Sequence, residues 1–328
     1  MSMKKILITG GSGFIGTNLI KQLGVDAGVN VSSLDIAPPK RGDDMPVWQQ
    51  VDLRDGAALD MAVRAFQPDA VIHLAARTDL DGRKISDYSS NTDGTSRLLE
   101  ALDSADFKGP AIFTSSMYVC RPGYRPSSDT DYQPHTVYGE SKVLGEELVR
   151  AANPSYPWII TRPTSIWGPW FGVPYIDFFK IVLSGRYLHI AKDHTQKTYG
   201  YVGNTVAQIL KIIEHADALK GRTLYLGDWP ATVITEWSDE IAAFVPYRVP
   251  RAPRVAFNAL AFVGDALQGV GVRFPMTSFR LQNMTTDNVH DLSPLQSLMG
   301  SLPFTRAQGN ELTVQWIRDH AQQSRNLE

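Results

Sequence analysis

Cysteine is almost absent from this 328-residue chain, which contains only Cys120. A single cysteine cannot form an internal disulfide, and such low cysteine use is typical of proteins kept in a reducing compartment. An excess of charge of one sign is also absent, because 32 lysines and arginines stand against 34 aspartates and glutamates. We therefore expect a cytoplasmic protein without the basic surface that binds nucleic acid.

Long apolar runs are lacking as well. No stretch approaches the roughly 18 uninterrupted apolar residues of a membrane-spanning helix. The N-terminal segment MSMKKILITG has an apolar run that ends at Thr9 and Gly10, which is too short for the core of a signal peptide. Histidines, cysteines and carboxylates show no metal-ligand spacing. We expect no membrane span and no metal.

The first half of the chain alternates short β-type runs with helical patterns. This alternation predicts an α/β fold with a doubly wound, mostly parallel sheet covered on both faces. The expected strands lie at 4–10, 30–36, 68–76, 110–116 and 156–163, and the expected helices lie at 13–24, 56–67, 91–105 and 138–152. From about residue 168 the alternation breaks. We expect a Rossmann-type dinucleotide-binding domain over 1–167, rejoined by segments at about 195–230, and a smaller α/β substrate cap over most of 168–328.

A glycine-rich turn follows the first expected strand in ILITGGSGFIGTNLI. Its glycines are Gly10, Gly11, Gly13 and Gly16, and two registers of the dinucleotide fingerprint fit them. Glycines let the backbone approach a pyrophosphate, which the following helix N-terminus stabilises. Asp35, at the end of the second expected strand, is placed to accept hydrogen bonds from adenosine ribose hydroxyls and to repel a 2′-phosphate. We predict NAD as cofactor, with NADP left open because Lys40 and Arg41 lie close behind.

The segment YGESKVLGEELVR places Tyr138 four residues before Lys142, on one face of the expected helix. A phenol with its usual pKa near 10 is a poor base at neutral pH. A neighbouring ammonium and a positively charged nicotinamide favour the phenolate and lower that pKa. Tyr138 can then remove a hydroxyl proton as hydride leaves the same carbon, or return a proton to a ketone.

Together these features resemble the extended short-chain dehydrogenase/reductase family, the NAD-dependent epimerase/dehydratase group that includes nucleotide-sugar epimerases and dehydratases and 3β-hydroxysteroid dehydrogenases. Several motifs occur in the same order along most of the chain. They are TGGSGFIG at 9–16, Asp35, DLRD at 52–55, HLAA at 73–76, NTDGT at 91–95, FTSSMYV at 113–119, YGESK at 138–142, RPTSIWGP at 162–169 and YVGN at 201–204.

The resemblance implies a catalytic trio in which Ser116 polarises the reacting C–O bond and Tyr138 moves the proton, with Ser115 as the alternative serine. It implies that Lys142 also binds the nicotinamide ribose. The cofactor-binding residues that it implies are Gly10, Gly13, Phe14, Ile15, Gly16, Asp35, Asp52, Leu53, Leu74, Ala75, Ala76, Tyr138, Lys142 and Pro163. His73 stands in an apolar run and is interpreted as a core histidine.

The resemblance also bears on the reaction. Sugar 4,6-dehydratases of the family carry an Asp–Glu pair after the serine or threonine, where this chain has Met117 and Tyr118. A thioether cannot perform that acid–base work, so we expect hydride transfer without elimination of water. The expected homodimer uses the two helices at 91–105 and 138–152. Their apolar residues Leu98, Leu99, Leu102, Val143 and Leu148 could equally pack on the sheet.

The substrate is less well specified. Nucleotide-sugar members hold the diphosphate with an asparagine and an arginine, where this chain has Ser165 and Lys197; Arg280 is a candidate second phosphate ligand, or part of a surface ion pair. Three hypotheses follow: an epimerase or 4-keto reductase/dehydrogenase on a nucleotide sugar, a 3β-hydroxysteroid-dehydrogenase-like enzyme, and a non-catalytic dinucleotide sensor. Polar residues interrupt the late apolar run VAFNALAFVGDALQGVG, so we expect a cap or lid helix there rather than membrane contact.

Overall fold

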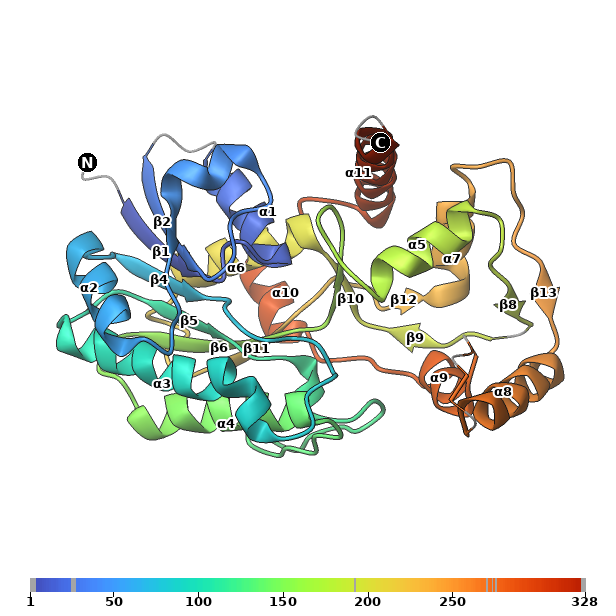
Figure 1. Ribbon diagram of the computed structural model, residues 1–328, viewed down its shortest axis with the longest axis horizontal. Coiled ribbons are helices and arrows are strands. Elements are labelled where there is room, and N and C mark those ends of the chain that lie inside the picture. Colours follow the sequence, from blue (N-terminus) through green and yellow to red (C-terminus); the bar gives the residue numbers. More distant parts are fainter. Residues whose placement is uncertain are drawn as a thin grey trace. The chain divides into compact units, whose positions relative to one another are not determined.

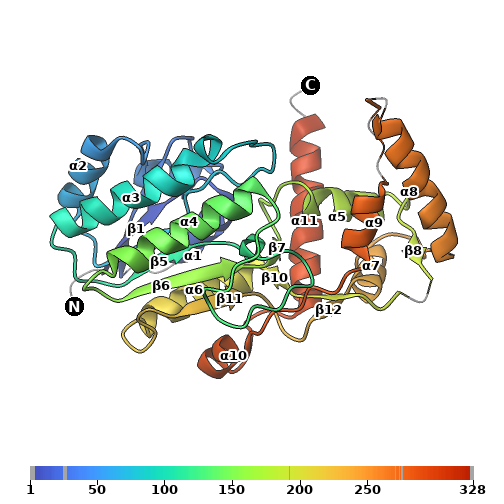
Figure 2. The same cartoon turned by 90° about the horizontal axis from the view of Figure 1, so that it is seen from below.

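The computed structural model describes residues 4–24, 28–191, 193–269, 271–272, 274 and 276–325, and the chain forms two compact units (Figures 1 and 2). The first unit consists of Met1–Trp170, Gly200–Asp228 and Asp291–Phe304. The second consists of Phe171–Tyr199, Trp229–His290 and Thr305–Glu328. The segment Asp291–Phe304, which lies in the part of the sequence predicted to form the cap, belongs to the first unit.

The first unit is built on a seven-stranded sheet in the order β11-β6-β5-β4-β1-β2-β3, with parallel neighbours throughout. The strands are β1 Lys4–Thr9, β2 Val29–Asp35, β3 Trp48–Gln50, β4 Ala70–His73, β5 Ala111–Thr114, β6 Trp158–Pro163 and β11 Thr223–Leu226. This architecture confirms the predicted doubly wound α/β fold. The short, polar strand β3 was not predicted, because its sequence WQQ lacks an apolar run.

Helices cover both faces of this sheet (Figures 1 and 2). Helices α2, α3 and α4 lie on one face, and α1 and α6 on the other. The bounds are α1 Phe14–Leu23, α2 Gly56–Phe66, α3 Ser89–Ser104, α4 Val137–Ala152, α6 Val202–Glu214 and α10 Ser293–Met299, with short 3-10 turns η1 Gly42–Val47, η2 Ile85–Tyr88 and η3 Met117–Val119. Two further strands of this region, β7 Ser165–Trp167 and β10 Tyr199–Tyr201, pair with each other.

Apolar side chains of α3 and α4 pack into the core against the sheet. Leu98 and Leu102 are fully buried, and Leu99 and Val149 are nearly so. Leu148 packs against the same cluster from a partly buried position. Of the two interpretations of the leucines on these helices, packing on the sheet is therefore the one observed. The homodimer stays a prediction.

The strand register collects the predicted site residues at one edge of the sheet. Thr9 is aligned with Leu34 on one side and with His73 on the other. His73 is aligned with Phe113, and Thr114 with Thr161. Because the strands are parallel, the residues that follow them lie together at the carboxyl edge, where open α/β sheets bind ligands.

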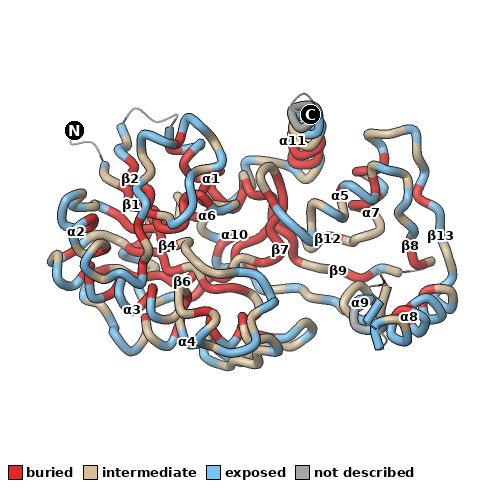
Figure 3. Tube along the Cα trace, in the orientation of Figure 1, coloured by how far each residue is buried: buried red, intermediate tan, exposed pale blue. Residues whose placement is uncertain are grey.

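The second unit contains helices and short strand pairs around an aromatic core. Its elements are α5 Tyr175–Leu183, β8 His189–Ile190, β9 Gln196–Lys197, β12 Thr232–Val233, α7 Ile234–Ala242, β13 Arg251–Ala252, α8 Arg254–Gly269, α9 Ser278–Met284 and α11 Arg306–Arg325. Strand β12 pairs antiparallel with β9, and β13 pairs parallel with β8. The ring of Trp237 contacts those of Phe178, Phe179 and Tyr199, and it is almost fully buried. Figure 3 shows the buried residues of the chain in red, among them those along β1, β4 and β6 of the seven-stranded sheet. None of the described helices combines the length and apolarity needed to cross a membrane.

Candidate active site

The glycine turn between β1 and α1 is shaped so tightly that side chains cannot enter it. Gly10 has a φ of +77°, and a Cβ atom there would lie 2.5 Å from the backbone nitrogen of Ala75. A Cβ atom on Gly16 would lie 2.4 Å from the carbonyl oxygen of Gly10. Gly13 is the N-cap residue of α1 and has no side chain to occupy the N–H groups of the first turn. This turn therefore fits a pyrophosphate at the helix N-terminus.

Asp35 lies beside this turn, at the end of β2. Its carboxylate accepts hydrogen bonds from the backbone N–H groups of Ser12 and Ala37, both at 3.0 Å. The Ser12 hydroxyl in turn donates to the carbonyl of Ala37 at 2.8 Å. Each carboxylate oxygen has a second lone pair. Asp35 is thus held against the glycine turn and can still accept from ribose hydroxyls.

The two cations behind Asp35 are already engaged. The Lys40 ammonium donates to the carbonyl of Trp170 at 3.1 Å, and burial lowers the pKa of Lys40 despite the nearby charge of Asp35. Arg41 pairs with Asp43 and Asp44, both at 3.1 Å. Neither cation is arranged as a dedicated receptor for a 2′-phosphate.

The other residues predicted to bind the cofactor fall into two groups. Leu74, Ala75 and Ala76 follow β4 at the carboxyl edge, where Leu74 N–H donates to the carbonyl of Thr9. Phe14 and Ile15 lie in the first turn of α1, and Pro163 ends β6 at the same edge. Asp52 instead pairs with Arg54 at 2.6 Å, and the Leu53 side chain is buried in the core. Because its side chain is buried, Leu53 can contact an adenine only through its backbone.

Tyr138 and Lys142 both lie on α4, as predicted, and each is only 7% exposed. The helix begins at the Thr136 cap, whose hydroxyl accepts from Gly139 N–H at 3.0 Å. A Cβ atom at Gly139 would lie 2.3 Å from the carbonyl oxygen of Tyr118, so glycine lets α4 approach η3 closely. The phenol is therefore set at a fixed distance from the turn that carries the candidate serine.

A buried hydrogen-bond chain fixes α4 against α3 at the level of the phenol. The Asn91 amide donates to the Ser141 hydroxyl at 2.9 Å, and Ser141 donates to the carbonyl of Tyr138 at 2.7 Å. Asn91 also exchanges hydrogen bonds with the backbone of Arg77, at 2.7 and 3.0 Å. Neither Asn91 nor Ser141 is among the site residues predicted from the sequence, because their hydrogen bond joins two helices that are separated along the chain.

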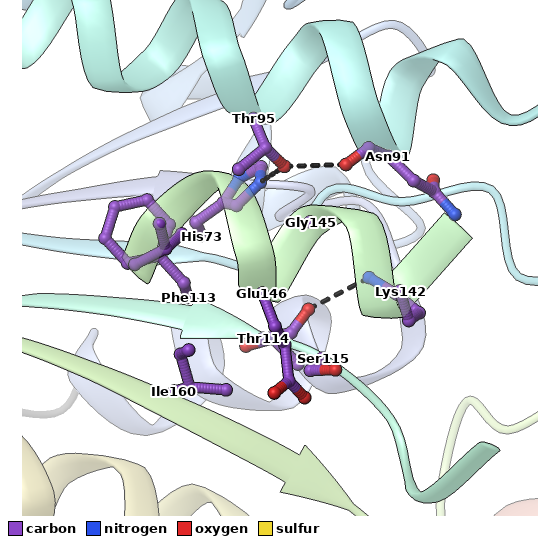
Figure 4. Close-up of a pocket in the computed structure, with 11 residues that line it drawn as sticks. His73, Asn91, Thr95, Phe113, Thr114, Ser115, Lys142, Gly145, Glu146 and Ile160 are labelled. Atoms are coloured by element: carbon purple, nitrogen blue, oxygen red, sulfur yellow. Dashed lines mark hydrogen bonds between the residues drawn. The ribbon is translucent and has the colours of Figure 1, made fainter. Parts of the chain in front are cut away.

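Burial moves the pKa values of the tyrosine and the lysine in opposite directions. Burial raises the pKa of Tyr138 to about 12, against the lowering effect of a hydrogen bond with Ser116. Burial lowers the pKa of Lys142 to about 8, against the raising effect of Glu146. The Lys142 ammonium donates to the carbonyl of Thr114 at 2.9 Å (Figure 4). Burial within the chain thus raises the pKa of the phenol, whereas the prediction from the sequence is that a neighbouring ammonium and a positively charged nicotinamide together lower it.

The two candidate serines have different surroundings. Ser116 is the N-cap of η3, where its oxygen accepts from Tyr118 N–H at 3.1 Å, and hydrogen bonding by its side chain lowers the pKa of Tyr138 against the effect of burial. The Ser115 hydroxyl is buried without a hydrogen-bond partner among the described residues. It lines a small cavity with Lys142 and Glu146 (Figure 4). Because Ser116, and not Ser115, lowers the pKa of Tyr138, Ser116 is the better candidate for orienting a reacting oxygen.

A buried ion pair supports α4 from behind. The Arg162 guanidinium donates to both carboxylate oxygens of Glu146 at 2.8 Å, and both side chains are 1% exposed. Arg162 also donates to the carbonyl of Asp129, and Tyr132 donates to Glu146 at 2.9 Å. Glu146 lies one helical turn after Lys142, so the pair joins α4, β6 and the loop before α4. In the sequence, the one indication of this ion pair is the charged Glu146 one helical turn after Lys142, on the face of α4 that is buried.

His73 has the contacts expected of a core histidine. Its ring nitrogens contact the hydroxyls of Thr9 at 2.7 Å and Thr95 at 3.1 Å. Burial and the charge of Lys142 lower the pKa of His73 to about 3. The imidazole is therefore neutral at physiological pH and holds β1, β4 and α3 together.

The predicted substrate residues lie in both units. Ser165 is a buried residue of β7 in the first unit. Lys197 ends β9 in the second unit, where its ammonium donates to the carbonyl of Asn283 and burial lowers its pKa. Arg280 is exposed on α9 of the second unit. Within the described part of the chain, no three His, Cys, Asp or Glu side chains are grouped as metal ligands.

Comparisons with known proteins bear on the family and the fold of the chain. The model of a family described as "NAD dependent epimerase/dehydratase family" matches residues 6–227. The chain is 27% identical to N-acetyl-alpha-D-glucosaminyl-diphospho-ditrans,octacis-undecaprenol 4-epimerase of Escherichia coli O157:H7, with 96% of each chain covered. It is 28% identical to dTDP-glucose 4,6-dehydratase of Neisseria meningitidis serogroup B, with 97% of this chain and 94% of the relative covered. The structure of UDP-glucuronic acid 4-epimerase from Bacillus cereus, in complex with UDP-glucuronic acid and NAD, is similar with a TM-score of 0.74 at 18% identity, covering 96% of this chain and 99% of that one.

Proposed function

Because the chain belongs to the NAD dependent epimerase/dehydratase family, we propose that it is an enzyme that interconverts a sugar carbinol and its ketone. It acts as an epimerase or as a 4-keto reductase/dehydrogenase. The observation that carries this proposal is the buried group of Tyr138, Lys142 and Ser116 at the same sheet edge as the glycine turn. Such a proton-moving group serves no purpose in a protein that only binds a dinucleotide.

The proposed chemistry divides the work among the chain's own residues. Bound NAD supplies a hydride acceptor and, once reduced, a hydride donor. Ser116 donates a hydrogen bond to the sugar oxygen and orients it toward the phenol. Tyr138 takes the hydroxyl proton when the carbinol is oxidised and returns it when the ketone is reduced. Lys142 holds the ribose and supplies the positive charge that counteracts the effect of burial on the phenol.

The turn after Ser116 argues against elimination of water. Met117 and Tyr118 occupy η3, where the resemblance implies an Asp–Glu pair in dehydratases. Burial raises the pKa of the Tyr118 phenol, so it is a weak acid here. Hydride transfer without dehydration is the simpler reaction for this set of side chains.

We propose a substrate in which the sugar is attached to a diphosphate. A nucleotide sugar is the form predicted from the sequence. The name of the Escherichia coli relative describes a sugar diphosphate on a polyprenol, and the Bacillus cereus structure holds UDP-glucuronic acid. The diphosphate is common to both, whereas the carrier differs. We propose NAD over NADP because Asp35 faces the glycine turn while Lys40 and Arg41 have other partners.

One assay distinguishes the competing functions. Purified protein is incubated with NAD or NADH and a panel of UDP-, GDP- and dTDP-sugars, polyprenyl-diphosphate sugars, 4-keto sugars and sterols. A net change in NADH indicates a dehydrogenase or reductase, and an isomerised sugar without net change indicates an epimerase. Turnover of sterols alone would favour the hydroxysteroid-type hypothesis. No turnover across the panel, with NAD still bound, would favour a dinucleotide sensor.

The role of the phenol is tested by Tyr138→Phe, which should abolish turnover while NAD binding survives. Tyr156→Phe is a matched control, because the Tyr156 hydroxyl is buried in the same unit without a hydrogen-bond partner among the described residues. The control should keep wild-type turnover. Turnover that persists in Tyr138→Phe would remove this tyrosine from the mechanism.

A further inference from the structure

Helix α8 of the second unit is apolar on its buried side. Its sequence, RVAFNALAFVGDALQG, contains only two charged residues, Arg254 and Asp265. Phe257 and Ala261 are buried, and they pack with Ile190 and Leu281. This contact satisfies the helix's requirement for core packing. The opposite side needs no apolar residue for folding.

The opposite side is nevertheless apolar as well. Val255 and Phe262 are both 74% exposed, and Val263 is 47% exposed. Together with the exposed Ala259 and Ala266 they form one stripe, which covers about 100° of the helix circumference. We call these five residues the outer stripe. Isolated exposed apolar residues are ordinary, but a continuous exposed stripe marks an interaction site.

Polar residues interrupt the apolar run VAFNALAFVGDALQGVG, but they lie outside the outer stripe. Asn258 and Asp265 project to one side of the stripe, and Gln268 lies nearer the buried side, by helical periodicity. The Asp265 carboxylate accepts from the backbone N–H of Ser278, at the start of α9, at 3.0 Å. In the sequence these polar residues interrupt the apolar run and favour a cap or lid helix over membrane contact. On the helix surface they leave the outer stripe continuous.

A row of exposed arginines precedes the outer stripe. Arg248, Arg251 and Arg254 occur three residues apart in RVPRAPR and are all exposed. Over the residues that the structure describes, none of the three forms an ion pair, although Arg306 of the same unit pairs with Glu240. Arg254 makes one hydrogen bond, of 3.3 Å, to the hydroxyl of Thr285.

Further exposed basic and apolar side chains precede the strand that pairs with β13. In the pair of β13 with β8, Arg251 is aligned with His189. Just before β8, Arg186 is exposed and Leu188 is 41% exposed. The combination of basic and apolar side chains thus comes from two segments distant in the sequence.

We propose that the outer stripe, together with the exposed Arg248, Arg251 and Arg254 that precede it, docks the protein onto an anionic lipid membrane. A helix with an apolar face and flanking basic residues lies in the plane of the membrane interface, with its apolar side chains in the acyl boundary. The arginines then contact anionic headgroups. A second copy of the chain is a poorer partner for this patch. In a symmetric dimer the arginines of the two copies would face each other, and the outer stripe contains no carboxylate that could neutralise them.

Membrane docking has a consequence for the substrate, and this consequence rests on the proposed function. An enzyme held at a membrane surface can act on a sugar diphosphate whose carrier is a lipid. A carrier embedded in the same membrane is concentrated there, so docking favours the polyprenyl-type member of the diphosphate class. Docking itself does not depend on any activity.

Vesicle flotation of the full-length protein tests the proposal without substrate or NAD. We expect binding to vesicles of phosphatidylcholine mixed with phosphatidylglycerol, and on the order of tenfold weaker binding to phosphatidylcholine alone or at high salt. The double variants Val255→Ser/Phe262→Ser and Arg248→Gln/Arg251→Gln should each weaken binding by a similar factor. All four side chains are exposed, so these variants should fold.

Matched controls come from the first unit. Met61→Ser removes an apolar side chain that is 68% exposed on α2, and Arg97→Gln/Lys108→Gln removes two exposed charges. Both controls should float like the wild type. Absence of wild-type flotation, or variants that float as well as the controls, would overturn the proposal. The proposal would also be overturned if the variant Val255→Ser/Phe262→Ser still floated with vesicles and changed only the molecular mass measured by light scattering, from a dimer to a monomer. If flotation succeeds but the sugar panel gives no turnover, docking stands and the proposed function fails.

Discussion

At the residue scale, two buried side chains one helical turn apart carry pKa shifts in opposite directions for one reason. Burial disfavours the charged form of each, so the Tyr138 phenol becomes a weaker acid and the Lys142 ammonium a stronger one. The neighbouring side chains alone therefore do not prepare a phenolate. In the proposed enzyme, positive charge at the bound nicotinamide is the additional influence that favours the phenolate.

The shift at Lys142 predicts an alkaline limit of activity. Its ammonium is protonated below its pKa of about 8 and neutral above it. Activity that needs this charge should fall as pH rises through about 8 in a profile of kcat/KM, which reports groups of the free enzyme. Lys142→Arg keeps its charge at all accessible pH values, so its residual activity should lack this fall. A wild-type profile that stays flat to about pH 10 would show that the charge is not needed.

Asp35 predicts the choice between the two dinucleotides. Asp35→Ala removes an acceptor for ribose hydroxyls and a repulsion against a 2′-phosphate. The dissociation constant of NAD should rise by about tenfold or more, while that of NADP should rise less or fall. Isothermal titration with both dinucleotides measures this, with Glu100→Ala as a control, since the Glu100 side chain is 55% exposed on α3 and pairs with Arg97, away from the glycine turn. A greater loss for NADP than for NAD would overturn the assignment of NAD.

At the scale of elements, α4 is held by partners that come from three other parts of the first unit. Asn91 of α3 holds it through Ser141. Arg162 of β6 holds it through Glu146, and that guanidinium lies 5.5 Å from the centre of the Tyr132 ring in the preceding loop. Lys142 itself bonds to the end of β5. The position of the phenol is therefore fixed by several elements at once.

The buried ion pair predicts a strong asymmetry between single and double replacement. Arg162→Met leaves the Glu146 carboxylate buried without its partner and should lower the free energy of unfolding by about 3–5 kcal/mol. Adding Glu146→Gln removes the uncompensated charge and should recover a large part of that loss. Urea denaturation measures both. The exposed pair of Arg97 with Glu100 provides the control, where Arg97→Met should cost less than about 1 kcal/mol. An Arg162→Met variant as stable as that control would contradict the assigned role.

At the scale of the whole molecule, the chain crosses between its two units several times, and the last segment to join the first unit is Asp291–Phe304. Phe304 exchanges two backbone hydrogen bonds with the Asn204 side chain, at 3.0 and 2.9 Å. Asn204 lies in α6, directly after β10. These contacts tie the late segment to the nucleotide-binding unit.

The glycine turn belongs to the first unit alone, so dinucleotide binding should stabilise that unit by mass action. At NAD concentrations of about 100 times the Kd, the gain is about 2.7 kcal/mol, which raises the Tm by several degrees. Gly16→Ala places a methyl group against the carbonyl of Gly10 and should remove this NAD-dependent rise. Thermal unfolding with and without NAD measures it. A variant whose Tm still rises with NAD would show that the nucleotide binds elsewhere.

Much of the fold and part of the site could be predicted from the sequence because their signals are local. The glycine spacing, the Tyr138–Lys142 spacing and the strand–helix alternation each lie within a short window, and α4 begins within one residue of its predicted start. The pair of Glu146 and Arg162 could not be predicted, since its members are separated along the chain and meet only when α4 packs on β6. The same holds for Asn91 and Ser141.

The sequence by itself determined where the backbone turns and which residues share one face of a helix, because both depend on residues that are close together along the chain. The tertiary structure decided which side chains are buried away from water and which charged side chains form pairs. Burial depends on what other elements cover a residue, and it set the direction of the pKa shifts at Tyr138 and Lys142. It also decided that Ser116, and not Ser115, lowers the pKa of the phenol, and that the outward side of α8 stays exposed.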